Sequence, residues 1–149
     1  MNIIKCVLTV ICALSLTLAS LSAAPVAGDI YVSGLNLLVK VNADGTQTII
    51  PTTVLTPSGL VFDQSGNVYL ADSLTKSVVK IGPDGTETTV ATGLGNPQDL
   101  ALDAQGNLYI ADAGNNTIVK VTTNGTKSTF ATGLNGPAGL AFDATGNLF

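Results

Sequence analysis

The chain has 149 residues and a formal net charge of −4, and its composition is 46% hydrophobic and 11% charged, which is too apolar for a disordered chain. Six lysines and arginines against ten carboxylates argue against a nucleic-acid partner, because phosphate binding needs a clustered basic surface. The sequence contains no histidine, which excludes Ser-His and Cys-His catalytic pairs and histidine-ligated metals from this chain.

The first 24 residues have the composition of a secretory signal peptide. Lys5 precedes an apolar run over residues 6–19, which is shorter than the roughly 20 residues that a membrane-spanning helix needs, and small residues follow it. We therefore predict that residues 1–24 direct export and are removed, at a site left open between residues 22 and 24. Residues 25–149 would then form a secreted or periplasmic protein without a membrane span. Both cysteines lie in the predicted signal peptide, so we expect no disulfide in the exported chain.

The remainder of the sequence repeats with a period of 40 residues. Residues 57–96 align with residues 97–136 without a gap, and 17 of the 40 positions are identical. The recurring positions include three prolines, three aspartates and three lysines: Pro57, Pro97, Pro137, Asp63, Asp103, Asp143, Lys40, Lys80 and Lys120.

Each repeat predicts four short strands. In the first complete copy these are residues 59–63, 67–72, 77–81 and 86–92, all rich in Val, Thr, Tyr, Phe or Ile. Asp84-Gly85 has the residue types of a tight hairpin turn, and no helical spacing occurs after the signal peptide. The first two strands are apolar on both faces and the last two alternate, so we expect burial to fall from the first strand to the fourth. The repeated lysines are then expected to point into solvent from the third strand.

Four antiparallel strands that recur every 40 residues predict an all-β fold made of β-propeller blades. A β-solenoid is the alternative, although its turns are shorter and its strands parallel. Residues 28–32 match the second strand of a repeat, and residues 137–149 match a first strand and the start of a second. We therefore expect sheets of three, four, four and two strands. Because an open arc leaves apolar blade faces uncovered, we expect the chain to be a C-terminally truncated fragment of a longer propeller.

The segment from Leu100 to Asn116, with its pattern apolar-Asp-x-x-Gly-Asn-apolar-Tyr-apolar-Ala-Asp, resembles the NHL repeat. It is also similar to repeats of the gluconolactonase/regucalcin (SMP-30) group and of streptogramin-lyase-like proteins, and the resemblance covers Gly28–Phe149. It implies a six-bladed propeller, of which about three blades are present. Fold does not determine function here, because the relatives include interaction modules, sensors and metal-dependent lactonases.

In the lactonase relatives, polar residues just before the first strand of each blade face the central channel and hold a divalent cation. The matching positions are Ser58, Gln98 and Ala138, and they form with Asp99 the candidate channel lining. Because Ser58, Gln98 and Ala138 lack the carboxylates that a hard cation prefers, we assign no catalytic, cofactor or metal residue. Asp99 replaces a glycine of the other repeats, and we interpret it either as a ligand contact or as a solvated residue between loop and strand.

Other recurring residues have structural interpretations. Asp63, Asp103 and Asp143 lack the spacing of a calcium loop, and we expect them to accept main-chain N–H bonds in tight turns. Asp72 and Asp112 end the second strand, where we expect a hydrogen bond to the next turn. We expect a ladder of aromatic residues to pack between blades: Tyr31, Tyr69, Tyr109 and Phe149.

The sequence favours an exported, non-enzymatic binding or scaffold module. We expect a protein or a small ligand to dock at the rim or the channel mouth, and we expect neither a cofactor nor nucleic acid. The alternative is a metal-dependent, lactonase-like hydrolase or lyase that uses a divalent ion such as Ca²⁺ and whose site is completed by further blades.

Overall fold

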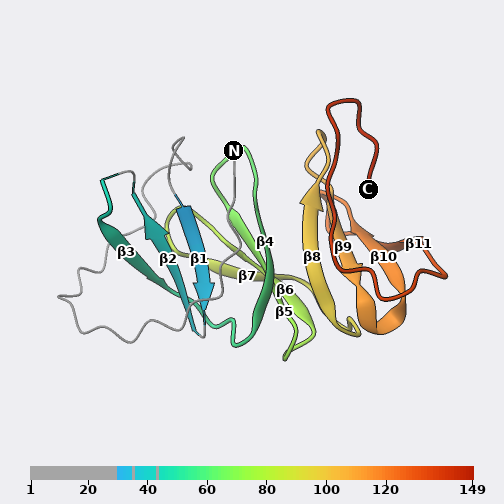
Figure 1. Ribbon diagram of the computed structural model, residues 1–149, viewed down its shortest axis with the longest axis horizontal. Helices are drawn as coiled ribbons and strands as arrows, with labels where there is room; N and C mark the ends of the chain where they lie inside the picture. The colour runs from blue at the N-terminus through green and yellow to red at the C-terminus, as the bar shows by residue number, and fades with distance from the viewer. Residues whose placement is uncertain (1–29, 35, 43) are drawn as a thin grey trace.

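The computed structural model describes residues 30–34, 36–42 and 44–149, and the predicted signal peptide lies outside them. Within these residues eleven strands form three antiparallel sheets (Figure 1). One short 3₁₀ helix, η1 (Ala113–Asn115), interrupts the strands. Across the same ranges, no helix has the length and apolar character needed to cross a membrane.

In each sheet the strands lie in the order in which they follow one another along the chain. The first sheet has the order β1-β2-β3, the second β4-β5-β6-β7 and the third β8-β9-β10-β11. The strand bounds are β1 Ile30–Gly34, β2 Leu37–Val41, β3 Gln47–Pro51, β4 Pro57–Phe62, β5 Val68–Asp72, β6 Ser77–Ile81, β7 Glu87–Ala91, β8 Pro97–Leu102, β9 Leu108–Asp112, β10 Thr117–Val121 and β11 Lys127–Ala131.

The strand count confirms the all-β prediction and the 40-residue blade. The second and third sheets have four strands each, and the first begins at the strand expected to be second in its blade. Gly85 and Gly125 have φ values of +80° and +85° in the predicted hairpin turns, a conformation that favours glycine. Residues 137–149 form one isolated bridge, Phe142 to Leu148, where two strands were expected.

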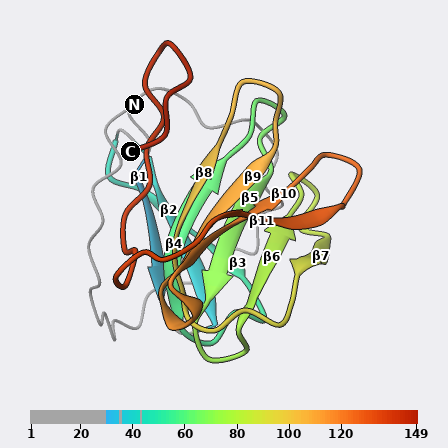
Figure 2. The same ribbon diagram turned by 90° about the vertical axis from the view of Figure 1, so that its right-hand side faces the viewer.

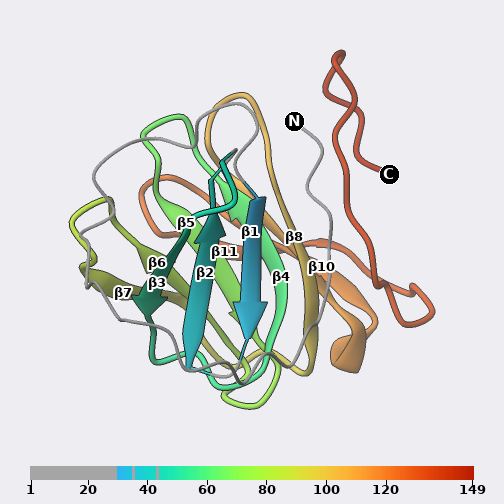
Figure 3. The same cartoon turned by 60° about the vertical axis from the view of Figure 1, so that its left-hand side comes forward.

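The three sheets stand side by side like blades, with β4 and β8 as adjacent inner strands (Figure 1). Figure 3 shows the first sheet standing in front of β4, and Figure 2 shows the red C-terminal segment crossing the third sheet. Apolar side chains fill the space between neighbouring sheets in two clusters, centred on Leu70 and on Ile110. A third, smaller cluster joins the third sheet to Leu140, Phe142 and Leu148. Burial between sheets therefore stabilises the arrangement.

Burial across a blade differs from the expected gradient. The outer strands β7 and β11 are mostly exposed, as predicted. The third strands β6 and β10 are nearly as buried as the second strands β5 and β9, whereas the first strand β4 is only half-buried. The prediction of a half-exposed third strand was wrong, because side chains on both faces of β6 and β10 pack into the apolar clusters on the two sides of each sheet.

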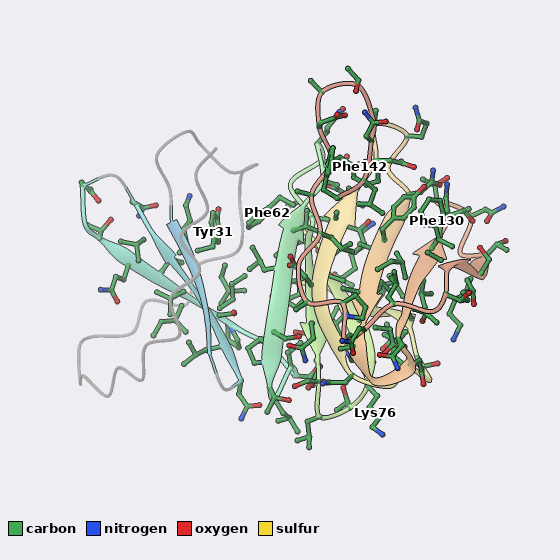
Figure 4. The ribbon with its side chains drawn as sticks, turned by 45° about the vertical axis from the view of Figure 1, so that its right-hand side comes forward. Tyr31, Phe62, Lys76, Phe130 and Phe142 are labelled. Carbon is green, nitrogen blue, oxygen red and sulfur yellow. The ribbon has the colours of Figure 1, made fainter. Side chains whose placement is uncertain are left out.

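Most of the predicted aromatic ladder lies between blades. Tyr31 packs against Phe62 of the next sheet, with ring centroids 4.4 Å apart (Figure 4). Tyr109 packs edge-on against Phe142 at 5.0 Å, and Tyr69 packs on the core between the second and third sheets. Phe149 does not follow the pattern: its side chain is 75% exposed, because the structure describes no later blade that would cover it.

The repeated lysines do not simply point into solvent. Lys80 lies over the Tyr69 ring at 5.8 Å, and Lys120 lies over the Tyr109 ring at 4.9 Å, in each case from the neighbouring strand. The Lys120 ammonium also lies 3.7 Å from the Asp103 carboxylate. The ammonium group of each lysine therefore lies over the face of an aromatic ring, a favourable cation–π arrangement.

Candidate functional site

Loops from successive blades gather at one end of the molecule, which we call the crossing-loop end. It contains residues 52–56, 92–96 and 132–136, which join the outer strand of one blade to the inner strand of the next, and residues 73–76 and 113–116, which join the second strand to the third. The inner strands β4 and β8 begin at this end, so the candidate channel residues lie there as well. Binding residues are often found on such loops because a rigid scaffold positions them.

The buried carboxylate of Asp72 holds the first crossing loop in place. Its side chain is 1% exposed and accepts hydrogen bonds from the Leu55 N–H at 3.0 Å, the Thr56 N–H at 3.2 Å and the Thr56 hydroxyl at 2.9 Å. It also accepts the N–H groups of Leu74 and Thr75 in the following loop. One carboxylate thus joins both loops of the blade, and the predicted bond to the next turn is confirmed.

Asp112 has the same role in the following repeat. Its side chain is fully buried and accepts the N–H groups of Gly95, at 2.9 and 3.0 Å, and of Asn96, at 2.8 Å. The Asn115 side-chain amide donates a further bond at 2.8 Å. The two aspartates therefore form a repeated clamp, each holding its crossing loop in one conformation.

We expect the stability of the chain to fall between about pH 4 and pH 2. Burial raises the pKa of Asp72, but hydrogen bonds from Leu55, Thr56 and Thr75 outweigh it and lower the pKa from 3.8 to about 2. A carboxyl whose pKa is lower in the folded state stabilises the fold above its unfolded pKa, and this contribution is lost as the pH falls through the folded value. Hydrogen bonds also lower the pKa values of Asp103 and Asp143, so protonation of these two carboxylates should destabilise the fold over the same pH range.

Urea unfolding from pH 7 to pH 2 measures this effect. Asp72→Asn should be less stable than the native chain at pH 7 and should lose less stability on acidification, since the Asp72 contribution is already absent. Equal pH profiles for the two proteins would contradict the proposed role of the carboxylate.

The candidate channel residues lie on successive inner segments. The Ser58 hydroxyl donates a 2.6 Å hydrogen bond to the Pro97 carbonyl, so it links β4 to β8. Gln98 is half-buried at the same position of β8, and Ala138 is exposed before Leu140. The three residues thus occupy the same position on three successive inner segments. That they line a channel stays a prediction.

Asp99 is a buried residue of β8, so its interpretation as a solvated residue was wrong. Its carboxylate accepts the Leu140 N–H at 3.0 Å. On the other side, its main chain packs so closely on Gly59 that a Cβ added there would lie 2.6 Å from the Asp99 Cα. Asp99 therefore connects three successive inner segments, and its alternative interpretation as a ligand contact stays a prediction.

The aspartates of the hairpin turns behave as predicted. Asp63, Asp103 and Asp143 each accept the N–H groups two and four residues later, at 2.8 to 3.0 Å. In the described ranges, no three His, Cys, Asp or Glu side chains come together in a way that could hold a metal ion. The hydroxyl, amide and methyl groups of Ser58, Gln98 and Ala138 also do not form the oxygen-rich, carboxylate-containing set that Ca²⁺ requires.

The two clamped loops carry different side chains at their tips, a feature that the sequence reasoning missed. Leu55 and Leu74 are exposed, Leu74 by 60%. Gly95 and Gly114 occupy the same repeat positions, and there the two main chains touch: a Cβ added at Gly114 would lie 2.5 Å from the Gly95 carbonyl carbon. The sequence did contain a signal for this pair: two loop positions are leucine in one repeat and glycine in the next.

Comparison with known proteins identifies the repeat. Residues 94–121, which span β8 to β10, match the family described as the NHL repeat. The chain carries an NHL repeat. No match was found among curated protein sequences.

Solved structures share the blade arrangement around this NHL repeat. A streptogramin B lyase superposes with a TM-score of 0.72 and 22% identity, over 85% of this chain and 45% of the lyase. A chain of the nidogen/laminin complex superposes with a TM-score of 0.67 and 22% identity, over 77% of this chain and 48% of that one. The calcium-binding protein regucalcin from Agrobacterium tumefaciens superposes with a TM-score of 0.61 and 19% identity, over 71% of this chain and 40% of regucalcin.

These comparisons confirm the resemblance to NHL and gluconolactonase-type propellers at the level of the fold. The chain spans less than half the length of each of these three structures. The propeller fold is shared by lyases and by binding proteins, so it does not decide between the two functions.

Proposed function

We propose that the chain is an exported, non-enzymatic binding module whose partner docks at the crossing-loop end. The proposal rests on one observation: equivalent aspartates hold the crossing loops of two repeats, whereas the side chains at the loop positions Leu55/Gly95 and Leu74/Gly114 differ between the repeats. Asp72 and Asp112 hold the loops of two blades in the same way, while the exposed side chains on those loops differ completely. A constant frame with variable exposed residues is how rigid scaffolds present recognition loops.

The loop tips of the second sheet favour an apolar partner surface. Leu55 and Leu74 lie on the two loops that Asp72 joins, so they are held near each other with little freedom left to lose on binding. Lys76 follows on the same loop and points away from the body of the protein (Figure 4), where it can pair with an acidic group. We therefore propose a protein or peptide partner with an apolar residue beside a carboxylate.

Leu74→Ala should weaken such binding by about tenfold or more, because burying one leucine side chain contributes roughly 1.5–3 kcal/mol. Peptides selected by display on the native protein supply the probe, and their dissociation constants are measured by calorimetry on the native protein and the variant. Ser65→Ala, an exposed substitution in a hairpin turn at the opposite end, serves as the control and should leave binding unchanged.

Two results would contradict this proposal. The first is binding that Leu74→Ala leaves intact and Ser65→Ala removes. The second is tight binding of Ca²⁺ or Zn²⁺ together with metal-dependent hydrolysis of a lactone, which would support the lactonase-like alternative. Export is tested separately: protein recovered outside the cytoplasm should have the mass of a chain cleaved between residues 22 and 24.

A further inference from the structure

The turn between β10 and β11 differs in one side chain from the equivalent turns of the other two sheets. Asp44, Asp84 and Asn124 occupy the same repeat position, and each is followed by a glycine and a threonine. In all three turns the side-chain Oδ1 accepts the N–H of that threonine, at 2.9 Å in the first two and 3.0 Å in the third. The turn therefore requires only an acceptor at this position, which a carboxylate and an amide both supply.

The asparagine adds an amino group that the turn does not use. The Asn124 Oδ1 accepts the Thr126 N–H and the Thr122 hydroxyl. Asn124 and Thr126 are both exposed, and within the described part of the chain neither the Asn124 Nδ2 nor the Thr126 hydroxyl makes a hydrogen bond. The segment Asn124-Gly125-Thr126 has the form Asn-x-Ser/Thr, which is the acceptor sequence for N-glycosylation.

A second sequence of the same form, Asn115-Asn116-Thr117, lies in the crossing-loop end. There the Asn115 Nδ2 donates a 2.8 Å hydrogen bond to the buried Asp112 carboxylate. The main chain of Gly95 is so close that a Cβ added to it would lie 2.9 Å from the Asn115 Cγ. A sugar on the Asn115 nitrogen would therefore crowd the clamp that Asp112 forms. We expect chains that receive a sugar there before folding not to reach the folded, secreted state.

We propose that Asn124 is an N-glycosylation site of the folded protein and that Asn115 is not. This proposal rests on the export that the proposed function includes, because the acceptor sequence serves secreted proteins. The Asn124 Nδ2 forms a bond to the anomeric carbon of a sugar carried on a lipid diphosphate. The bond from that carbon to the diphosphate oxygen breaks, its electron pair leaves with the diphosphate, and one amide proton passes to a base of the transferase.

The turn can keep its hydrogen bonds with the sugar attached. Glycosylation changes the Asn124 nitrogen, whereas the two bonds of the turn end on the Asn124 oxygen. The Gly125 N–H bond to the Thr122 carbonyl, at 2.8 Å, joins main-chain atoms only. We therefore expect the glycosylated chain to fold as the unmodified chain does.

Secretion of the full chain from a eukaryotic host that N-glycosylates exported proteins tests the proposal. The chain is produced once with its own residues 1–24 and once with a signal peptide of the host in their place. Intact mass before and after digestion with a glycan-releasing amidase shows whether a glycan is present, and the aspartate that the amidase leaves marks its position. The expected result is one glycan, attached to Asn124.

The two signal peptides separate failure of export from failure of glycosylation. Glycosylated protein obtained only with the host signal peptide would support Asn124 as the site and would contradict export directed by residues 1–24. Secreted protein without a glycan on Asn124 would overturn the glycosylation proposal whichever signal peptide is used. A glycan on Asn115 of the folded, secreted protein would overturn it as well.

Matched variants identify the acceptor. Thr126→Ala should remove the whole glycan mass, because it deletes the hydroxyl of the acceptor sequence, whereas Thr126→Ser should retain it. Thr117→Ala makes the same change in the second sequence and is the control, which should retain the glycan. If Thr126→Ala is not secreted, Asn124→Asp removes the acceptor nitrogen and restores the residue of the other two turns. A glycan that persists in Asn124→Asp or Thr126→Ala would contradict the assignment.

Discussion

Replacing Asp112 with alanine should lower the free energy of unfolding by about 3–5 kcal/mol. The change leaves the Gly95 and Asn96 N–H groups and the Asn115 amide without the acceptor that they share in the native structure. A half-buried donor without a partner costs about 1–3 kcal/mol, and small domains have only about 5–15 kcal/mol of stability in total. Urea unfolding followed by circular dichroism measures the difference.

The matched control is Asp84→Ala. Asp84 is an exposed residue of a hairpin turn and accepts one main-chain bond, from Thr86. Its removal should cost much less stability than the loss of Asp112, because water can replace the lost bond. If the two variants were equally stable, the clamp formed by Asp112 would have no special role in holding the crossing loop.

Gly59→Ala should destabilise the chain by about 2–3 kcal/mol, although it adds only one methyl group. The new Cβ would lie 2.6 Å from the Asp99 Cα and 3.0 Å from the Gln98 carbonyl oxygen. Both are main-chain atoms of β8, so relief requires a shift of one inner strand relative to the next. The thermal unfolding midpoint should therefore fall by several degrees.

Gly139→Ala is the control for this substitution, because Gly139 occupies the same repeat position. A Cβ added at Gly139 meets no atom of the chain within 4 Å. The free energy of unfolding of this variant should match that of the native protein within about 0.5 kcal/mol. A comparable loss in both variants would mean that the close packing of β4 on β8 does not limit stability.

The blade pattern follows from sequence because its signals are local. Glycine at positions such as Gly85, with a positive φ, and alternating or continuous β-branched runs define hairpins whatever the neighbouring blades do. The turn aspartates, for example Asp63, are predictable for the same reason: the main-chain N–H groups that they accept lie only two and four residues along the chain.

Features that depend on the next blade were predicted less well. The burial of β6, the position of Lys120 over Tyr109 and the buried place of Asp99 all depend on contacts across strands or with segments 40 residues away. The exposed pair Leu55 and Leu74 was missed because alternation patterns describe strands, whereas this pair lies on two loops brought together by Asp72.

By itself, the 40-residue repeat determined the strand order within each blade, the antiparallel pairing and the three-stranded start of the arc. These depend on spacing along one chain segment. Only the tertiary structure decided which side chains lie between blades and which loops meet at one end, because both are set by how successive sheets pack on one another. The candidate site belongs to this second class, since Asp72 and Asp112 place its loops through contacts between distant segments.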